Sequence, residues 1–93
     1  MSERILRQLR EKIRTLQYVV TVHAEEEIDS DQLTIFDVEH CILTGSIMER
    51  QRDRNSGEIK FRVRGRTIDV ARVEAIVKIG PTRKLFMITV YLL

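Results

Sequence analysis

The apolar residues of this chain change their spacing near residue 46, and this change limits what the chain can fold into. Before that point they recur every three or four residues, which is typical of amphipathic helices. After it they alternate with polar residues, as in strands with one buried and one exposed face. Helices followed by an antiparallel sheet of about four strands predict an α+β fold, with the N-terminal helices packed on one face of the sheet.

The helical part of the chain contains two clear helix signals. In order, the elements expected there are an amphipathic helix at 2–17, a short β-branched run at 18–22, a helix-compatible stretch at 24–28 and a second helix from residue 34. Thr34 and Asp37 have the spacing of a capping box. Gly45 is a typical helix end, so the second helix is expected to stop there.

The alternating part of the chain predicts the strands of the sheet. They are expected around residues 47–51, over 59–64, over 71–79 and over 85–92, with a hairpin turn at 55–57 between the first two. Lys60, Arg62 and Arg64 occupy the polar positions of the second strand, so its exposed face is basic. The last strand is apolar on both faces, which favours a position inside the sheet.

The length of 93 residues leaves room for one hydrophobic core, because single domains usually hold about 100 to 150 residues. We expect one domain over residues 1–93, with an N-terminal helix at 1–17 and an α+β domain at 18–92. The uncharged runs, such as 41–48 and 85–93, are much shorter than the roughly 20 apolar residues of a membrane span. A single cysteine, Cys41, excludes an intramolecular disulfide and favours the cytoplasm.

The net charge of +2 is the sum of segments with opposite signs. Residues 1–16 and 48–66 are basic, whereas residues 23–40 hold seven carboxylates and no lysine or arginine. Most of the basic residues are arginine, whose planar guanidinium binds phosphate and carboxylate in a fixed geometry. Two interpretations follow: the basic segments bind an anionic partner, or they pair with the acidic segment of the same molecule.

Several short motifs occur in a characteristic order. They are His23-Ala24, Asp37-Val38-Glu39, Gly45, Ile47, Glu49, Phe61-x-Val63-x-Gly65 and Ile88-Thr89-Val90-Tyr91. This set, within residues 18–92, resembles a family of small bacterial domains of unknown function, which is similar to the RelE- and MqsR-like toxins of type II toxin–antitoxin systems. The chain departs from the family's pattern at Glu27, where an arginine is usual, and over 68–77, which lacks a second histidine.

The resemblance implies a RelE-like toxin fold and a function as a metal-independent endoribonuclease or an inhibitor of translation. It also implies RNA or the ribosome as a target and a cognate antitoxin as a partner. RNA cleavage without a metal needs a base for the 2′-hydroxyl, an acid for the leaving 5′-oxygen and cations for the phosphorane. His23 is the candidate base, Tyr91 the candidate acid or a platform for a nucleobase, and Arg62 the candidate catalytic cation.

These catalytic candidates have structural alternatives. His23 would otherwise be a structural histidine at a strand-to-helix junction, and Tyr91 a core residue with its hydroxyl at the rim. The side chains expected to bind RNA beside Arg62 form one basic patch on the first hairpin: Arg50, Arg52, Lys60 and Arg64. The alternative is a solvated face, partly neutralised by nearby carboxylates: Glu49, Asp53 and Glu58.

No metal ion and no cofactor are expected. The carboxylates that come into question are Glu49, Asp53, Asp69 and Glu74. Their spacing does not converge on one point, and such side chains more often lie opposite arginines in a sheet. His40 and Cys41 are expected to be surface or packing residues.

A second hypothesis is a non-catalytic interaction module with the same fold. The acidic segment 23–40 and the basic sheet are complementary, which favours a homodimer or a charged protein partner. RNA binding that weakens steeply with salt would favour the first hypothesis. Dimerisation that depends on concentration, without RNA binding, would favour the second.

Overall fold

The computed structural model describes residues 2–93, with Ser2 described through its backbone only. The elements follow in the order α1 (Ser2–Arg14), β1 (Tyr18–Val20), α2 (Val22–Ser30), α3 (Ile35–Thr44), β2 (Ser46–Arg52), β3 (Ile59–Arg66), β4 (Arg72–Ile79) and β5 (Leu85–Leu92). This mixture of helices and strands confirms the α+β class. None of the helices in residues 2–93 is long and apolar enough to cross a membrane.

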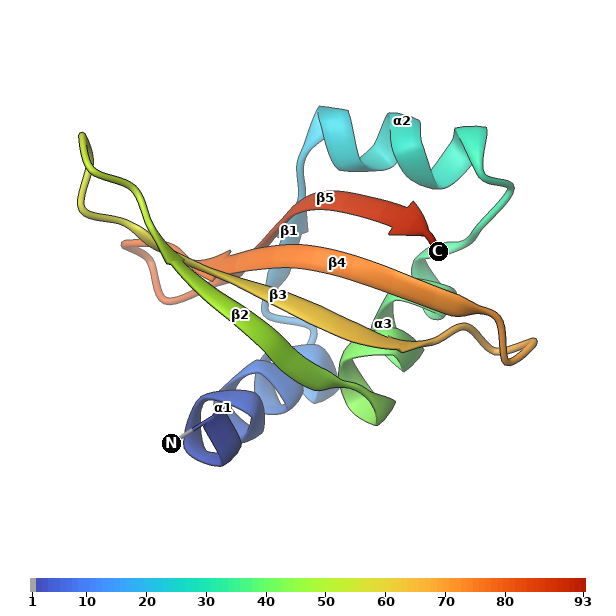
Figure 1. Cartoon of the computed structure of the whole chain (residues 1–93), viewed down its shortest axis with the longest axis horizontal. Helices are drawn as coiled ribbons and strands as arrows, with labels where there is room; N and C mark the ends of the chain where they lie inside the picture. Colours follow the sequence, from blue (N-terminus) through green and yellow to red (C-terminus); the bar gives the residue numbers. More distant parts are fainter. Residues whose placement is uncertain (1) are drawn as a thin grey trace.

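The strands of the described residues form one five-stranded sheet in the order β1-β5-β4-β3-β2 (Figure 1). β2 to β5 are antiparallel neighbours and correspond to the four predicted strands. β1 adds a fifth strand that runs parallel to β5. The prediction of a block of N-terminal helices followed by a purely antiparallel sheet is therefore wrong. The β-branched run after α1 joins the sheet and separates α1 from α2. β5 lies between β1 and β4, which confirms its predicted interior position.

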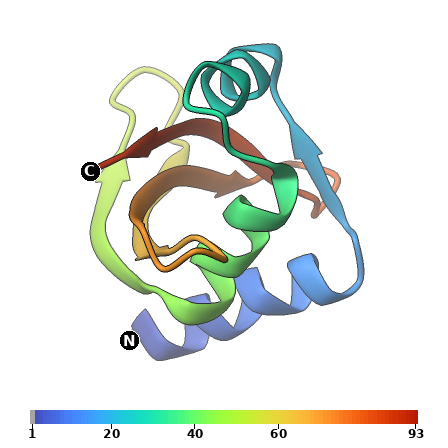
Figure 2. The same cartoon turned by 90° about the vertical axis from the view of Figure 1, so that its right-hand side faces the viewer.

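α1 and α3 cover one face of the sheet, which we call the inner face. The sheet curves around α3, and α1 packs against α3 (Figure 2). The buried side chains between these layers include Leu9, Val38, Ile42, Val63, Val77 and Met87. The predicted capping box starts α3: Asp37 N donates to the Thr34 hydroxyl, and Thr34 N donates to the Asp37 carboxylate. Gly45 follows the last residue of α3, as predicted.

The C-terminal end of α3 lies directly on β3, at two glycines of the sequence motif. A Cβ atom on Gly45 would lie 2.5 Å from the carbonyl oxygen of Cys41, and one on Gly65 would lie 2.1 Å from the same atom. Both distances are far shorter than any real contact, so a side chain at either position would force the helix and the strand apart. Glycine at these two positions therefore allows α3 and β3 to pack at backbone distance.

α2 lies along an edge of β5 instead of on the inner face, so the expectation that all helices cover one face is wrong for α2. β1 pairs with β5 only as far as Met87. Beyond that point, α2 and its C-cap residue accept hydrogen bonds from N–H groups of β5. Glu27 accepts one from Val90 at 2.9 Å, and Asp31, the C-cap, accepts one from Leu92 at 3.3 Å. Unpaired strand edges promote aggregation, and α2 protects this one in place of another strand.

Two β-bulges decide which side chains point away from the helices. Relative to its neighbour, β2 has one extra residue at Met48 and β5 has one at Ile88. Because side chains alternate along a strand, one extra residue moves the following side chains to the other face. The bulge in β5 thereby places Tyr91 opposite Glu74 on the outer face, the side of the sheet away from α1 and α3.

Candidate functional site

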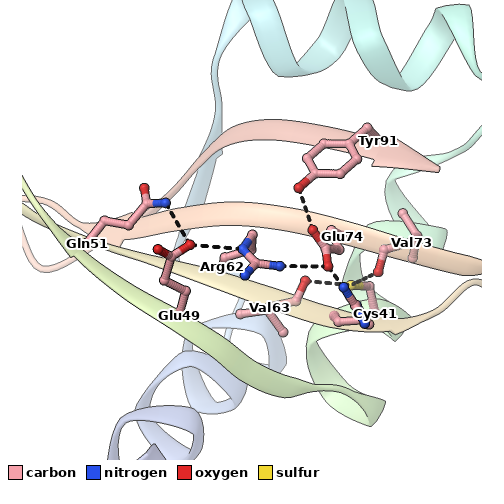
Figure 3. A network of polar contacts seen from close by, with 9 residues as sticks. Cys41, Glu49, Gln51, Arg62, Val63, Val73, Glu74 and Tyr91 are labelled. Carbon is pink, nitrogen blue, oxygen red and sulfur yellow. Dashed lines mark hydrogen bonds and ion pairs between the residues drawn. The ribbon is translucent and has the colours of Figure 1, made fainter. Parts of the chain in front are cut away.

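A polar network centred on Glu74 occupies the outer face (Figure 3). The Glu74 side chain is 2% exposed. Its Oε2 accepts hydrogen bonds from Arg62 Nη1 at 3.0 Å and Arg64 Nε at 2.6 Å, and its Oε1 accepts one from the Tyr91 hydroxyl. Arg62 Nε also donates to Glu49 at 3.2 Å. We call these five residues the Glu74 network.

The partners in the network stabilise the carboxylate of Glu74, which is buried in the sheet. An isolated buried carboxylate is very unfavourable, and it is tolerated only when charged and hydrogen-bonding partners surround it. Both oxygens of Glu74 are occupied, and no buried side-chain oxygen or nitrogen in residues 2–93 lacks a hydrogen-bond partner. Two strands, β3 and β5, supply the donors to this carboxylate of β4, so the network also fixes the relative positions of the three strands.

The hydrogen bonds of the network shift the protonation equilibria of its members. Burial alone raises the pKa of Glu74, but the hydrogen bonds from Tyr91, Arg64 and Arg62 outweigh it, and the pKa lies below its ordinary value. The hydrogen bond to Glu74, followed by burial, raises the pKa of Tyr91. At neutral pH the network therefore holds an ionised carboxylate and a protonated phenol.

The two arginines of the network differ in how much of each side chain remains exposed. Arg62 lies between Glu49 and Glu74 and is 25% exposed, whereas Arg64 contacts Glu74 alone and is 36% exposed. The hydrogen bonds to Glu49 and Glu74 raise the pKa of Arg62 further. Arg64 is thus the cation of the network that is more available to an external anion.

His23 lies beside the Glu74 network, at the start of α2. Thr21 caps this helix by accepting a hydrogen bond from Ala24 N, which places His23 in the first helical turn. His23 and Tyr91 line the same groove, of about 360 Å³, between α2 and the end of β5. The structure thus brings together two residues that are 68 positions apart in the sequence.

The groove that contains His23 is acidic. Its walls include three carboxylates, those of Glu26, Glu27 and Asp31. Nε2 of His23 lies 3.3 Å from Glu27 Oε1, the same oxygen that accepts the Val90 N–H. The His23 side chain is 66% exposed, so one side of the imidazole contacts Glu27 while the other faces solvent.

The basic patch expected on the first hairpin is divided between the two faces of the sheet. The bulge at Met48 puts Glu49 opposite Arg62 and Arg50 opposite the buried Phe61. Arg50 therefore shares the inner face, and Arg52, two residues further on, does the same. The expected patch of five cations on one face is wrong, because an extra residue in β2 reverses its alternation.

Of the other residues expected to bind RNA, Lys60 and Arg64 share the outer face with Arg62. Lys60 is paired with Gln51 in the register of β2 and β3. Of the three carboxylates expected to neutralise the patch, two have other partners. Asp53 accepts N–H groups of its own turn, and Glu58 pairs with Lys78. Glu49 does contact Arg62.

The prediction that carboxylates lie opposite arginines is confirmed for Glu49 and Glu74. The second of these was missed as a member of the site, and its position among the basic side chains of neighbouring strands was the signal that could have found it. Within residues 2–93 there is no group of three or more histidine, cysteine or carboxylate side chains that could hold a metal ion.

Two further residues take the packing roles expected for them. Cys41 is buried against β3 and β4, with its Sγ 3.6 Å from the carbonyl oxygen of Val73, and burial raises the pKa of its thiol to about 12. Such a thiol is a poor nucleophile. His40 Nδ1 lies 2.8 Å from the carbonyl oxygen of Arg66 and ties α3 to the end of β3.

The acidic segment 23–40 is not neutralised in the way that one interpretation of the sequence required. Among the ion pairs of the described chain, none joins a lysine or arginine to a carboxylate of this segment. Exposed carboxylates of α2, such as Glu25 and Asp29, remain at one end of the molecule. The basic α1 lies at the opposite end, below the sheet in Figure 1, whereas the tip of the β2–β3 hairpin projects to the left.

Fold and site together define a small α+β domain with a buried ion network on the outer face of its sheet and a histidine beside it. The chain belongs to the family described as a domain of unknown function, DUF4258, which matches residues 20–92. This confirms the predicted resemblance to a family of domains of unknown function, with α1 outside the match. No curated protein sequence and no solved structure matches the chain significantly.

Proposed function

We propose that the protein is a toxin-type domain that cleaves RNA without a metal ion, at the outer face between α2 and β5. The observation that carries the proposal is the meeting of His23 and Tyr91 in one groove, next to the arginines that share Glu74 with Tyr91. A histidine, a phenol and two guanidinium groups are a sufficient set for general acid–base cleavage of RNA. They come from three segments that are distant in the sequence.

In the proposed reaction, His23 takes the proton of the ribose 2′-hydroxyl. The 2′-oxygen attacks phosphorus, an O–P bond forms, and the bond from phosphorus to the 5′-oxygen breaks. Tyr91 gives its phenolic proton to the leaving 5′-oxygen. The imidazolium of His23 then releases its proton to solvent and the tyrosinate takes one up, so that both residues return to their starting states. The products are a 2′,3′-cyclic phosphate and a 5′-hydroxyl.

Glu74 acts as a positioning residue in this reaction. It keeps Tyr91 protonated, because its hydrogen bond and, to a smaller extent, its negative charge raise the pKa of the phenol. Arg62 and Arg64 occupy its other oxygen, so the phenol can turn towards a substrate without leaving the carboxylate unpaired. Arg64 is the more exposed of the two and is the proposed contact to the phosphate.

The proposal includes the RelE-like fold, a cytoplasmic location and a cognate antitoxin that protects the producing cell. It is tested with a labelled oligoribonucleotide of mixed sequence in the presence of EDTA. The wild type should release a 2′,3′-cyclic phosphate, and the 2′-deoxy analogue should stay intact. His23→Ala should lose about 100-fold or more in rate, which is a typical contribution of a general base. The matched control is His40→Gln, because His40 lies outside the groove.

Induction of the chain in a bacterium gives the second arm of the test. The wild type should arrest growth, and a folded His23→Ala variant should not. Equal growth arrest by the wild type and by His23→Ala would refute the role of His23. A folded wild type that neither cleaves RNA nor arrests growth would refute the proposed activity.

The carboxylates around His23 favour a second candidate function, a non-catalytic interaction module. Glu26, Glu27 and Asp31 repel phosphate, and Arg62 is already paired on both sides. Such a module would bind a basic protein surface or a second copy of this chain through α2. Sedimentation at several concentrations, with and without RNA, separates the two candidates.

A further inference from the structure

A groove on the inner side of the molecule is larger than the one beside His23. It has a volume of about 620 Å³ and lies between the first turns of α1 and the β2–β3 hairpin. Its apolar lining consists of Ile5, Ile47, Ile59 and Phe61. Phe61 is 8% exposed and belongs to the hydrophobic core, and the three isoleucines are partly buried and pack against it. The floor of the groove is therefore formed by side chains at the edge of the core.

Two arginines stand at the rim of this groove, one on each wall. Arg4 comes from α1 and Arg50 from β2, and both side chains are exposed. The bulge at Met48 is what turns Arg50 to this side, because it puts Arg50 in register with Phe61. In the part of the chain that the structure describes, neither arginine has a carboxylate at ion-pair distance.

We propose that this groove binds an amphipathic helix of another protein, one whose apolar stripe is flanked by aspartate or glutamate. The apolar stripe would cover Ile5, Ile47 and Ile59, and the acidic flanks would meet Arg4 on one side and Arg50 on the other. The charge complementarity is two-sided, since Arg4 comes from one wall and Arg50 from the other. Arg52 shares the face of Arg50 through strand alternation, and Arg7 lies beside Arg4 in a neighbouring depression that also contains Glu11. This inference concerns the inner face and does not depend on the proposed cleavage of RNA.

A helix suits the groove because the inner face already carries a helical layer that is incomplete. α3 covers β3 and β4, while α1 packs mainly against α3 and leaves the half of the hairpin beyond it open. A further helix beside α1 would extend this layer over the hairpin and bury its isoleucines. The remaining apolar surface of the core would then be removed from water.

A second copy of this chain does not supply such a helix within residues 2–93. The exposed face of α1 is basic and would be repelled by Arg4 and Arg50. α2 is acidic, but its apolar residues Ala24 and Ile28 are buried against its own domain, and α3 buries Val38, Cys41 and Ile42 in the same way. The occupant is therefore a different protein.

The probe for this site is a labelled peptide of about 18 residues, or roughly five turns of helix. It carries leucine at the i, i+3, i+4 and i+7 positions and glutamate at the flanking positions. Fluorescence anisotropy should show saturable binding to the wild-type chain. A peptide with serine in place of leucine, and one with lysine in place of glutamate, should not bind.

Charge reversals on the protein locate the peptide. Arg50→Glu should weaken its binding about tenfold, and the matched control Arg72→Glu, at the opposite end of the sheet from the hairpin, should have little effect. In the Arg4→Glu/Arg50→Glu variant the lysine peptide should bind and the glutamate peptide should not. All these arginines are exposed, so the variants are expected to fold.

Three outcomes would overturn the proposal. One is the absence of glutamate-peptide binding at about 1 mM, well above the affinity range of specific helix–groove complexes. Another is an equal loss of binding in Arg50→Glu and Arg72→Glu, which would indicate unspecific charge attraction. The third is full binding of the serine peptide, which would show that the apolar floor takes no part. His23→Ala should leave peptide binding unchanged.

Discussion

The two faces of the sheet use arginine in opposite ways. On the outer face, Arg62 and Arg64 are tied to carboxylates, and Glu74 at their centre is almost fully buried. On the inner side, Arg4 and Arg50 border an apolar groove, and the described residues provide no acidic partner for them. The outer arginines are held by carboxylates of the fold and keep only some N–H groups free, as at Arg64, whereas the inner ones have no carboxylate partner among the described residues.

The number of arginines on a surface is therefore a poor guide to what that surface binds. A guanidinium with a buried partner contributes to stability and to the shape of a site, and it offers an external anion only the N–H groups that its partner leaves free. An unpaired guanidinium beside an apolar floor contributes little to stability and can select an acidic amphipathic partner. Substitutions in the two sets should therefore have opposite effects on stability and on binding.

The largest effect on stability is expected from Glu74→Ala. It leaves Arg62 and Arg64 without their shared partner, and we expect the free energy of unfolding to fall by about 3 kcal/mol. The matched change on the inner side, Arg50→Ala, should alter it by less than about 0.5 kcal/mol. Urea denaturation followed by circular dichroism measures both. Equal effects of the two substitutions would contradict the distinction between the two sets of arginines.

A smaller difference in stability is expected between two positions on the inner face: Gly65, where α3 packs directly on β3, and Ile59, which lines the open groove. Gly65→Ala pushes a Cβ atom into the backbone of Cys41 and should cost about 2 kcal/mol. Ile59→Ala removes a side chain from the partly exposed floor of the groove and should cost about 1 kcal/mol.

The same denaturation series measures these two variants. The result against our interpretation would be Gly65→Ala as stable as the wild type, since α3 and β3 would then not pack at backbone distance.

Much of the fold could be predicted from the sequence because its elements depend on local signals. Alternation of apolar residues predicted β3 and β4, the hairpin turn predicted β2, and a continuous apolar run predicted β5. Thr34, Asp37 and Gly45 predicted the bounds of α3. The parallel pairing of β1 with β5 could not be predicted in this way. It joins residues 18–20 to residues 85–87, and no local pattern specifies so distant a partner.

The candidate site was predictable only in part, for a related reason. His23 and Tyr91 were found through motifs, but the face on which a strand presents its side chains depends on register. The bulges at Met48 and Ile88 shift that register by one residue, and neither position carries a glycine or another residue typical of a bulge. Arg50 was therefore expected on the wrong face.

The pH dependence of stability gives a finer test of the outer network. The pKa of Glu74 lies below its ordinary value when the chain is folded. The network therefore stabilises the fold fully above the ordinary glutamate pKa, about 4.3, and this contribution disappears as the pH falls through the lower folded value. Glu74→Gln should lack that acid-dependent part of the unfolding free energy.

The control for this test is Arg50→Ala, which should keep the wild-type profile. Other carboxylates with lowered pKa values, such as Asp37 and Asp53, titrate in the wild type and in Glu74→Gln alike. The difference between the stability curves of these two proteins therefore isolates Glu74. Parallel curves for the wild type and Glu74→Gln would mean that the carboxylate is not ionised in the fold.

The smallest effect is spectroscopic and concerns Tyr91. The chain has two tyrosines and no tryptophan, so ultraviolet absorbance reports tyrosine ionisation directly. Burial, followed by the hydrogen bond to Glu39, raises the pKa of Tyr18 to about 12, and the hydrogen bond to Glu74 raises that of Tyr91. In Tyr18→Phe, the remaining tyrosine should titrate above its ordinary value of about 10, and adding Glu74→Gln should move the midpoint back towards that value.

The sign of this shift links the network to the proposed chemistry. A phenol whose folded pKa is raised stabilises the fold below about pH 10, and that stabilisation is lost as the pH rises through the folded value. A raised midpoint means that Tyr91 holds its proton against Glu74 throughout the neutral range, as a general acid must. An ordinary midpoint in Tyr18→Phe, unchanged by Glu74→Gln, would show that the hydroxyl does not bond to Glu74. It would also remove the argument that Glu74 positions Tyr91.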